Sequence, residues 1–337
     1  MKADMGVNMD LPHAAPHASG HKSGAGSEAF CFAHLSDPHL TSLQGVRCPD
    51  LLNKRLLGYL SWRWRRRREH RGEVLEALLA DLDRHRPRLR LVTGDLTHVG
   101  LPREFMEAAA WLRRLGAPEE VLVIPGNHDS YVRAPWDRTY AHWRPYLDEV
   151  ADGNGFPLLR RQDGVAFIGA SSACPTPPFF ATGRLGRAQL ARLEGLLAET
   201  GRAGLVRVLL IHHPPLPGAI AWRKRLVDAR ALAALLRRTG VELILHGHTH
   251  RATCGELVTA AGPAPVLGVP SASALGHKPG RRAGYHLCRI TAHGAARRLE
   301  VFVRGYDPVR RQFVALERRE LALPGSFSAP AAAAAGQ

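Results

Sequence analysis

Residues 121–129 read Val-Leu-Val-Ile-Pro-Gly-Asn-His-Asp, so an apolar run ends in a glycine followed by polar side chains. Short apolar runs bounded by Gly, Pro or Asp are typical of buried strands. The same order, an apolar run and then oxygen or imidazole donors, recurs at Asp37-Pro38-His39, Gly94-Asp95, His212-His213-Pro214 and Gly247-His248-Thr249-His250. Open α/β sheets bind ligands at the carboxyl ends of their strands, so this pattern predicts one sheet edge that collects all of these donors.

The remaining apolar runs and helical periodicities predict an α/β fold. Strands are predicted at 30–35, 89–93, 121–125, 165–170, 206–211 and 242–245. Helices with one apolar face are predicted at 73–85, 103–115, 187–198 and 228–238. Because strands and helices alternate, most of the sheet should be parallel. Later strands without helices between them, at 265–269, 285–290 and 298–304, predict an antiparallel portion or a second sheet packed on the first.

The chain of 337 residues is long enough to bury one large core, and the donors come from both of its halves. We therefore predict one catalytic domain at 29–322. Residues 1–28 are rich in Gly, Ala, Ser, Pro and His, and 323–337 in Ala, Pro and Ser, so both are predicted to be disordered tails. The first tail lacks the apolar middle region of a signal peptide. No segment has the roughly 18 apolar residues that a membrane span needs.

The chain has a net charge of +16, and most of its basic residues are arginine. The resulting field should attract anions such as phosphate esters, nucleic acid or an acidic membrane face. A general bias of the composition toward Ala, Leu and Arg explains the same charge equally well. The 5 cysteines are widely spaced and include no Cys-x-x-Cys pair, which argues against a disulfide framework or a thiolate zinc site and favours a reducing cytoplasm.

The segment at about 50–72 departs from the alternation of strands and helices. Its leucines and tryptophans are mixed with arginines, and the residues of interest are Trp62, Trp64, Arg65, Arg66, Arg67 and Arg68. One interpretation is an amphipathic insertion that rests on an anionic membrane surface or caps the active site. The other is a solvated helix whose leucines pack onto the domain. Nucleic-acid binding has weaker support, because no helix-turn-helix or zinc-finger pattern accompanies the segment.

The chemistry of the donor groups points to a pair of metal ions. Two cations about 3.5–4 Å apart lower the pKa of a shared water, orient a phosphoryl group and stabilise the attacking and leaving oxygens. Carboxylate, imidazole and amide ligands suit divalent manganese, iron, zinc or cobalt. The donors therefore predict a two-metal site for the hydrolysis of phosphate esters.

In this order, the donor groups resemble the signature of the calcineurin-like metallophosphoesterases: Asp-x-His, Gly-Asp, Gly-Asn-His-Asp or Glu, His-x-Pro and Gly-His-x-His. The resemblance covers roughly residues 30–252 and implies a four-layer α/β/β/α sandwich with a dinuclear centre. It implies that one metal is held by Asp37, His39 and His250, the other by Asn127, His212 and His248, and that Asp95 bridges them.

The resemblance also implies roles for the residues beside the ligands. His128 would contact the phosphate or protonate the leaving group, and Asp129 would orient it. His212 is the expected ligand rather than His213, because the family's ligand stands two residues before the proline. The purple acid phosphatases of this superfamily have a tyrosine where this chain has His98, so an iron-tyrosinate centre is not expected.

The donor groups look more similar to the bacterial cyclic-nucleotide and glycerophosphodiester phosphodiesterases. We therefore expect a phosphodiesterase that acts through a metal-bridging hydroxide, with two ions of Mn²⁺, Fe²⁺/Fe³⁺ or Zn²⁺. An alternative is hydrolysis of the pyrophosphate of UDP-diacylglucosamine in lipid A synthesis, because superfamily members with that activity combine this centre with an apolar, basic lid. Such an enzyme would be cytoplasmic, with peripheral contact to the inner face of the membrane.

A scaffold or nucleic-acid-binding protein on the same fold is the non-enzymatic alternative, although no expected ligand is missing from this chain. The sequence leaves open the physiological substrate, the identity of the metals and the oligomeric state.

Overall fold

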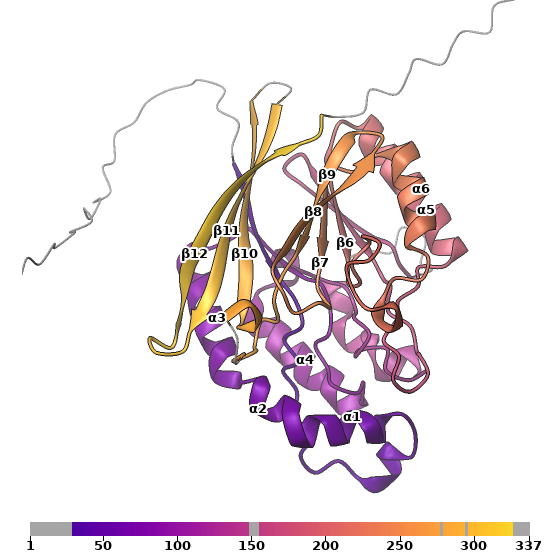
Figure 1. The fold of residues 1–337 in the computed structure, drawn as a ribbon, viewed down its shortest axis with the longest axis vertical. Coiled ribbons are helices and arrows are strands. Elements are labelled where there is room, and N and C mark those ends of the chain that lie inside the picture. Colours follow the sequence, from indigo (N-terminus) through magenta and orange to yellow (C-terminus); the bar gives the residue numbers. More distant parts are fainter. Residues whose placement is uncertain (1–28, 148–154, 277–278, 294–295, 326–337) are drawn as a thin grey trace, which may run out of the picture.

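Two six-stranded β-sheets form the centre of the protein (Figure 1). The computed structural model describes residues 29–147, 155–276, 279–293 and 296–325, so the predicted tail at 1–28 and residues 326–337 of the predicted C-terminal tail lie outside the described residues. The strands are β1 (Phe30–Leu35), β2 (Leu89–Val92), β3 (Val121–Val123), β4 (Leu158–Gln162), β5 (Val165–Ala170), β6 (Val206–Ile211), β7 (Leu243–His246), β8 (Thr253–Thr259), β9 (Gly262–Gly268), β10 (Gly284–His293), β11 (Ala296–Asp307) and β12 (Gln312–Leu323).

The first sheet has the strand order β12-β11-β10-β1-β2-β3, and the second has the order β4-β5-β6-β7-β9-β8. Parallel pairing joins β1, β2 and β3 at one end of the first sheet and β5, β6, β7 and β9 in the middle of the second. Most of the second sheet is therefore parallel, as predicted, whereas most pairings of the first are antiparallel. The predicted late strands exist but are divided between the sheets. β9 continues the parallel second sheet, whereas β10 pairs antiparallel with β1 and with β11 in the first.

The strands β4, β8 and β12 were not predicted from the sequence. Each lies at the edge of a sheet and pairs antiparallel with its neighbour. Their sequences, LLRRQ, TCGELVT and QFVALERRELAL, are too polar to read as buried strands. Leu323, the first residue of the predicted C-terminal tail, is the last residue of β12 and is buried.

Helices cover the outer face of each sheet, and the α-helices are α1 (Arg55–Ser61), α2 (Arg67–Glu69), α3 (Gly72–His85), α4 (Pro102–Leu115), α5 (Arg187–Arg202) and α6 (Ala229–Thr239). A π-helical turn at Trp62–Arg66 joins α1 to α2. Short 3-10 helices occur at Cys48–Leu51, Pro118–Glu120, Trp136–Arg138, Tyr140–Tyr146, Trp222–Lys224 and Pro279–Arg281. Figure 1 places α3 and α4 on one side of the pair of sheets and α5 and α6 on the other.

The apolar core explains these layers. Successive side chains of a strand point to opposite faces, so Phe30 and Phe32 of β1 share one face. Their rings pack against Phe167 of β5, with centroids 5.6 and 5.5 Å apart, which joins the two sheets. On the outside of the second sheet, Leu193 of α5 and Leu236 of α6 pack with residues of β6 and β7. The predicted four-layer α/β/β/α sandwich is therefore confirmed.

Within the described ranges, no helix combines the length and the apolar character needed to cross a bilayer.

Candidate metal centre

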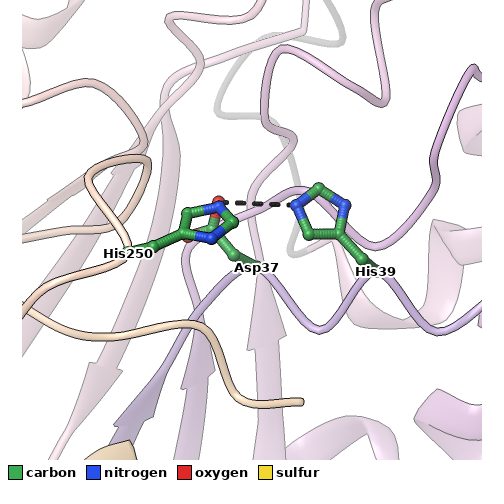
Figure 2. Close-up of side chains that lie close together, drawn as sticks. All are labelled: Asp37, His39 and His250. Carbon is green, nitrogen blue, oxygen red and sulfur yellow. Dashed lines mark ion pairs between the residues drawn. The ribbon is translucent and has the colours of Figure 1, made fainter. Parts of the chain in front are cut away.

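The predicted donors come together at the carboxyl ends of five strands, two of them in the second sheet. Asp37 and His39 follow β1, Asp95 follows β2 and Asn127 follows β3, while His212 follows β6 and His248 and His250 follow β7. Figure 2 shows Asp37, His39 and His250 side by side, with 3.1 Å between Nε2 of His250 and Oδ1 of Asp37. The parallel pairing of β1, β2 and β3, and of β6 and β7, brings about this convergence.

Asp95 lies between the two groups of donors. Its Oδ2 atom is 3.9 Å from Nε2 of His39 and 3.4 Å from Nε2 of His212. Nε2 of His212 is in turn 3.2 Å from Oδ1 of Asn127. One carboxylate therefore faces both groups, which is the geometry that a residue bridging two cations needs.

One buried polar atom in this cluster, Nε2 of His39, has no hydrogen-bond partner among the described residues. A second buried atom, Oδ1 of Asp37, faces Nε2 of His250 at 3.1 Å. Buried polar atoms almost always find a partner, because an unsatisfied one costs about 1–3 kcal/mol. The atoms belong to a group of Asp37, His39 and His250 whose donor atoms lie within 4.8 Å of one another, so a cation fits there.

Backbone carbonyls orient the imidazole rings of the candidate ligands. Nδ1 of His39 donates to the carbonyl of Thr97 at 3.0 Å, and Nδ1 of His212 donates to the carbonyl of Thr93 at 2.6 Å, so both rings turn Nε2 to the cluster. His248 uses the other nitrogen: Nε2 donates to the carbonyl of Lys224 at 3.0 Å, which leaves Nδ1 available. Such contacts fix the tautomer and the ring orientation of metal-binding histidines.

Burial and nearby charges determine the protonation states of the imidazole rings in the cluster. Burial and neighbouring histidines hold the pKa of His39 and of His248 well below the usual range, so both rings are neutral and keep the lone pair that a metal needs. Burial also lowers the pKa of His212, but the Asp95 carboxylate outweighs it and brings this pKa to about 9. Without a cation, His212 and Asp95 therefore pair as imidazolium and carboxylate, and a cation bound at Nε2 would take the place of that proton.

The backbone at the donors takes an unusual conformation. Positive φ angles occur at Asp37 (51°), His39 (40°), Asp95 (58°), His248 (65°) and His250 (51°). Residues with side chains rarely adopt this region, at a cost of about 1–3 kcal/mol each, and such strain clusters at functional sites. Gly126 makes room for one of the donors, since a Cβ atom there would lie 2.2 Å from Oδ1 of Asp95.

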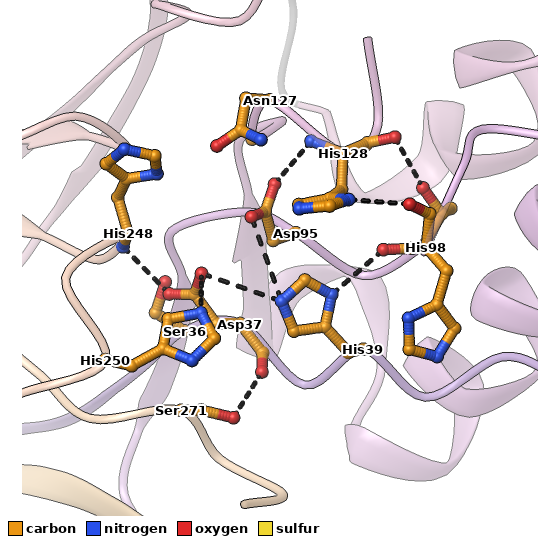
Figure 3. A network of polar contacts seen from close by, with 12 residues as sticks. Ser36, Asp37, His39, Asp95, His98, Asn127, His128, His248, His250 and Ser271 are labelled. Atoms are coloured by element: carbon orange, nitrogen blue, oxygen red, sulfur yellow. Dashed lines mark hydrogen bonds and ion pairs between the residues drawn. The ribbon is translucent and has the colours of Figure 1, made fainter. Parts of the chain in front are cut away.

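His128 and Asp129, the predicted catalytic residues, have different contacts. Nδ1 of His128 donates to the carbonyl of His98 at 2.6 Å, and its ring lies 4.9 Å from the His39 ring (Figure 3). The Asp129 carboxylate accepts hydrogen bonds from the amides of Asp95 (2.8 Å), Gly126 (2.8 Å) and Thr97 (2.9 Å). No hydrogen bond between described residues joins it to the His128 ring. The expected contact that would orient the His128 ring is therefore absent among the described residues. The Asp129 carboxylate accepts its hydrogen bonds from loop amides instead.

A sequence profile of the calcineurin-like phosphoesterase family matches residues 31–252. The chain belongs to this family. It is 32% identical over 189 residues to a cAMP/cGMP dual specificity phosphodiesterase of Mycobacterium tuberculosis, an alignment that covers 54% of each protein, so the chain spans about half of that relative's length. Over 244 residues it is 28% identical to a glycerophosphodiester phosphodiesterase of Enterobacter lignolyticus, covering 71% of this chain and 78% of that one.

Among solved structures, a dimetal phosphatase from Danio rerio is similar with a TM-score of 0.54. The likeness covers 88% of this chain and 99% of that one at 14% sequence identity, so it bears on the fold alone.

In this calcineurin-like phosphoesterase, the insertion at about 50–72 borders the cavity that contains the candidate metal ligands. It forms one wall of this cavity of about 1110 Å³, whose floor includes Asp95, Asn127 and His128. Trp64 lines this cavity with 69% of its surface exposed, and Arg65, Arg66 and Arg68 line it too. Trp62 is buried and packs with a small apolar cluster, while Arg67 borders a second, smaller cavity. The candidate residues of this segment are therefore divided among different environments.

Sequence reasoning missed His70, which directly follows α2. Its ring lies 4.5 Å from the ring of His39 and 5.9 Å from that of His250, and its Nδ1 is 2.8 Å from Oγ of Ser273. His70 belongs to none of the donor motifs and sits within an arginine-rich stretch. No signal in the sequence distinguishes it.

Proposed function

We propose that this chain hydrolyses phosphodiesters with the help of two divalent cations. The first would be held by Asp37, His39, Asp95 and His250, and the second by Asp95, Asn127, His212 and His248. The observation that carries the proposal is the buried Nε2 of His39, which has no hydrogen-bond partner among the described residues and faces the carboxylates of Asp37 and Asp95. Membership in the calcineurin-like phosphoesterase family supports it.

Bound cations would supply Lewis acidity toward the phosphoryl oxygens and would lower the pKa of water. The mixture of carboxylate, imidazole and amide donors suits Mn²⁺, Fe²⁺/Fe³⁺ or Zn²⁺, and no cysteine contributes.

His128 is the proposed proton donor to the leaving oxygen. Because Nδ1 donates to the carbonyl of His98, Nε2 is the atom that would carry the proton to the substrate, and Arg66 would have to release its 2.9 Å contact with Nε2 for that step. Burial and the nearby Arg66 hold the pKa of His128 well below its usual range, so the ring is neutral before a substrate binds. An anionic phosphodiester beside the ring favours the protonated form, which places the proton where the leaving alkoxide needs it.

Asp129 is the proposed positioning residue for the bridging carboxylate. Its hydrogen bonds to the amides of Asp95 and Gly126 tie the loop after β2 to the loop after β3. Burial, and then the Asp95 carboxylate, raise the pKa of Asp129 to about 7. It therefore acts on the reaction through Asp95.

We infer that the substrate class is a phosphodiester. The relatives named above act, by their names, on cyclic nucleotides and on glycerophosphodiesters. The segment at about 50–72 is proposed as a lid over the site, because three of its arginines and Trp64 line the cavity. A cytoplasmic location, peripheral membrane contact and the absence of nucleic-acid binding remain predictions.

The test is hydrolysis of bis(4-nitrophenyl) phosphate, a generic chromogenic diester, after loading of the protein with Mn²⁺. The expected result is turnover that a chelator removes and that fresh Mn²⁺ restores. Binding of two ions per chain without any turnover would contradict the proposal.

A further inference from the structure

The cavity above the metal cluster is strongly basic. Six basic side chains line it: Lys54, Arg65, Arg66, Arg68, Lys224 and Arg281. Within the described ranges, none of them forms an ion pair with a carboxylate. Lys54 instead donates to Oγ1 of Thr176 at 2.7 Å and to the carbonyl of Phe180. Of the acidic residues that line the cavity, Glu69 accepts from the amide of Gly276 at 3.0 Å, and Asp95 belongs to the metal cluster.

Several arginines elsewhere on the surface pair with acidic side chains, as in Arg114 with Glu76 (2.6 Å), Arg238 with Glu194 (2.8 Å), Arg298 with Glu320 (2.5 Å) and Arg319 with Glu317 (2.6 Å). The six cations of the cavity differ from these arginines in having no carboxylate partner among the described residues, although they share one space.

Four of the unpaired cations, Arg65, Arg66, Lys224 and Arg281, line the same cavity, so like charges face one space. Arg65 and Arg66 come from the lid, Lys224 from the 3-10 helix at Trp222–Lys224, and Arg281 from the one at Pro279–Arg281. Four charges from three separate segments converge on the same space, and an anion bound there would relieve their repulsion.

A simple phosphodiester does not account for this charge. It carries one negative charge, whereas two divalent cations bring four positive charges to a cluster with two carboxylates, Asp37 and Asp95. The metal site alone would therefore attract such an anion. Aromatic side chains that line the same cavity, Trp64, Tyr131, Phe179 and Phe180, offer flat surfaces on which a nucleobase can stack.

We propose that the preferred substrate is a nucleotide phosphodiester that carries a second phosphoryl group, received by Arg65, Lys224 and Arg281. This inference rests on the proposed phosphodiesterase function. Arg66 is excluded from the receiving set because its guanidinium already contacts His128, beside the scissile bond. The chemistry fits a linear dinucleotide with a terminal phosphate better than a single cyclic nucleotide.

The test compares diadenylate (ApA) with its 5′-phosphorylated form (pApA), which differ only in the second phosphate. With the Mn²⁺-loaded full chain, kcat/KM is expected to be at least about tenfold higher for pApA. This preference should fall to below about threefold in the double variant Arg65→Gln/Arg281→Gln. The matched control is Arg161→Gln/Arg238→Gln, which removes the same charge from two exposed arginines that pair with Glu199 and Glu194. It should leave the preference unchanged.

Equal kcat/KM for ApA and pApA would overturn the inference while leaving the phosphodiesterase proposal intact, and so would an equal loss of preference in the control. If no diester is cleaved, the proposed function fails. The inference of a site for a second phosphoryl group is then tested by ligand binding. Isothermal titration of the metal-loaded chain should then show adenosine 3′,5′-bisphosphate binding at least about tenfold more tightly than AMP. Equal affinities for these two compounds, neither of which has a diester bond, would overturn the inference on its own.

Discussion

The guanidinium Nη1 of Arg66 lies 2.9 Å from Nε2 of His128. A guanidinium can only donate, and Nδ1 of His128 already donates to the carbonyl of His98, so Nε2 accepts this hydrogen bond. The two residues are 62 positions apart, and Arg66 reaches the site from the π-helical turn of the lid. The lid is therefore in direct contact with the proposed proton donor.

Replacing Arg66 by Gln should lower kcat/KM for bis(4-nitrophenyl) phosphate by roughly 10²-fold, the usual loss when one preorganised donor at a reacting group is removed. Arg66→Lys should recover only part of the activity, because an ammonium lacks the planar fork of a guanidinium. Steady-state kinetics measure both effects. The control is Arg63→Gln, an exposed position on the same turn outside the cavity. An equal loss in the control would show that total lid charge, and not the contact with His128, matters.

Asp95→Asn should reduce the bound metal from about two ions per chain to one or fewer, because a neutral amide replaces the carboxylate that faces both sites. Metal content by plasma mass spectrometry gives the readout. Asp163→Asn is the matched control: it changes the same residue type at another positive φ (47°), where Asp163 pairs with Arg88 on the surface. Retention of two ions by the Asp95 variant would contradict the bridging role.

Metal binding should also stabilise the fold. At 100 times the Kd, a ligand that binds only the folded state adds about 2.7 kcal/mol to the free energy of unfolding. For a domain of this size, that corresponds to a rise in Tm of about 5–10 °C. Differential scanning fluorimetry with Mn²⁺ and with a chelator measures the shift. A Tm that is the same in both would count against a metal site built into the folded core.

Asp129→Asn should destabilise the protein by about 1–3 kcal/mol, because the amide group of asparagine cannot accept all the hydrogen bonds that the carboxylate receives from Asp95, Gly126 and Thr97. Urea denaturation gives this free energy of unfolding. Activity should fall together with metal content, because Asp129 acts through Asp95. Lost activity with full metal content would instead indicate that Asp129 takes part in proton transfer.

Gly126→Ala should abolish most of the activity, because the added Cβ atom would lie 2.2 Å from Oδ1 of Asp95 and 2.7 Å from Cε1 of His212. Gly195→Ala is the control for glycine replacement. Gly195 lies within α5 with no atom within 4 Å of the new Cβ, so alanine should raise the stability by about 0.5–1 kcal/mol. Diester hydrolysis and thermal melting of both variants test the pair. Full activity of Gly126→Ala would mean that the loop after β3 can move without harm.

The sequence was most informative where local pattern and tertiary role agree. Buried parallel strands are continuous apolar runs, so β1, β5 and β6 were predicted with their exact bounds, and the donors that follow the parallel strands converge as expected. The edge strands β4 and β12 were not predicted, because they contain many charged residues. Each is held in its sheet by antiparallel pairing with one neighbouring strand.

The lid was harder to predict for a related reason. Trp62 and Trp64 have the same chemistry and stand two residues apart, yet one is 6% exposed and the other 69%. Residues at that spacing point to different sides of a helical turn, and only the packing against Leu43, Val99 and Leu101 decides which side is buried. The amphipathic composition of the segment predicts that it has an apolar and a basic face. It does not predict which part of the protein each face contacts.

The donors belong to both sheets, since Asp37, Asp95 and Asn127 follow strands of the first sheet and His212 and His248 follow strands of the second. Two cations bound among these donors would thus link the two sheets at one end through reversible coordination bonds. All five cysteines of the chain are free thiols, so no disulfide performs this task. The concentration of free metal would then affect two quantities: the stability of the contact between the two sheets and the rate of hydrolysis.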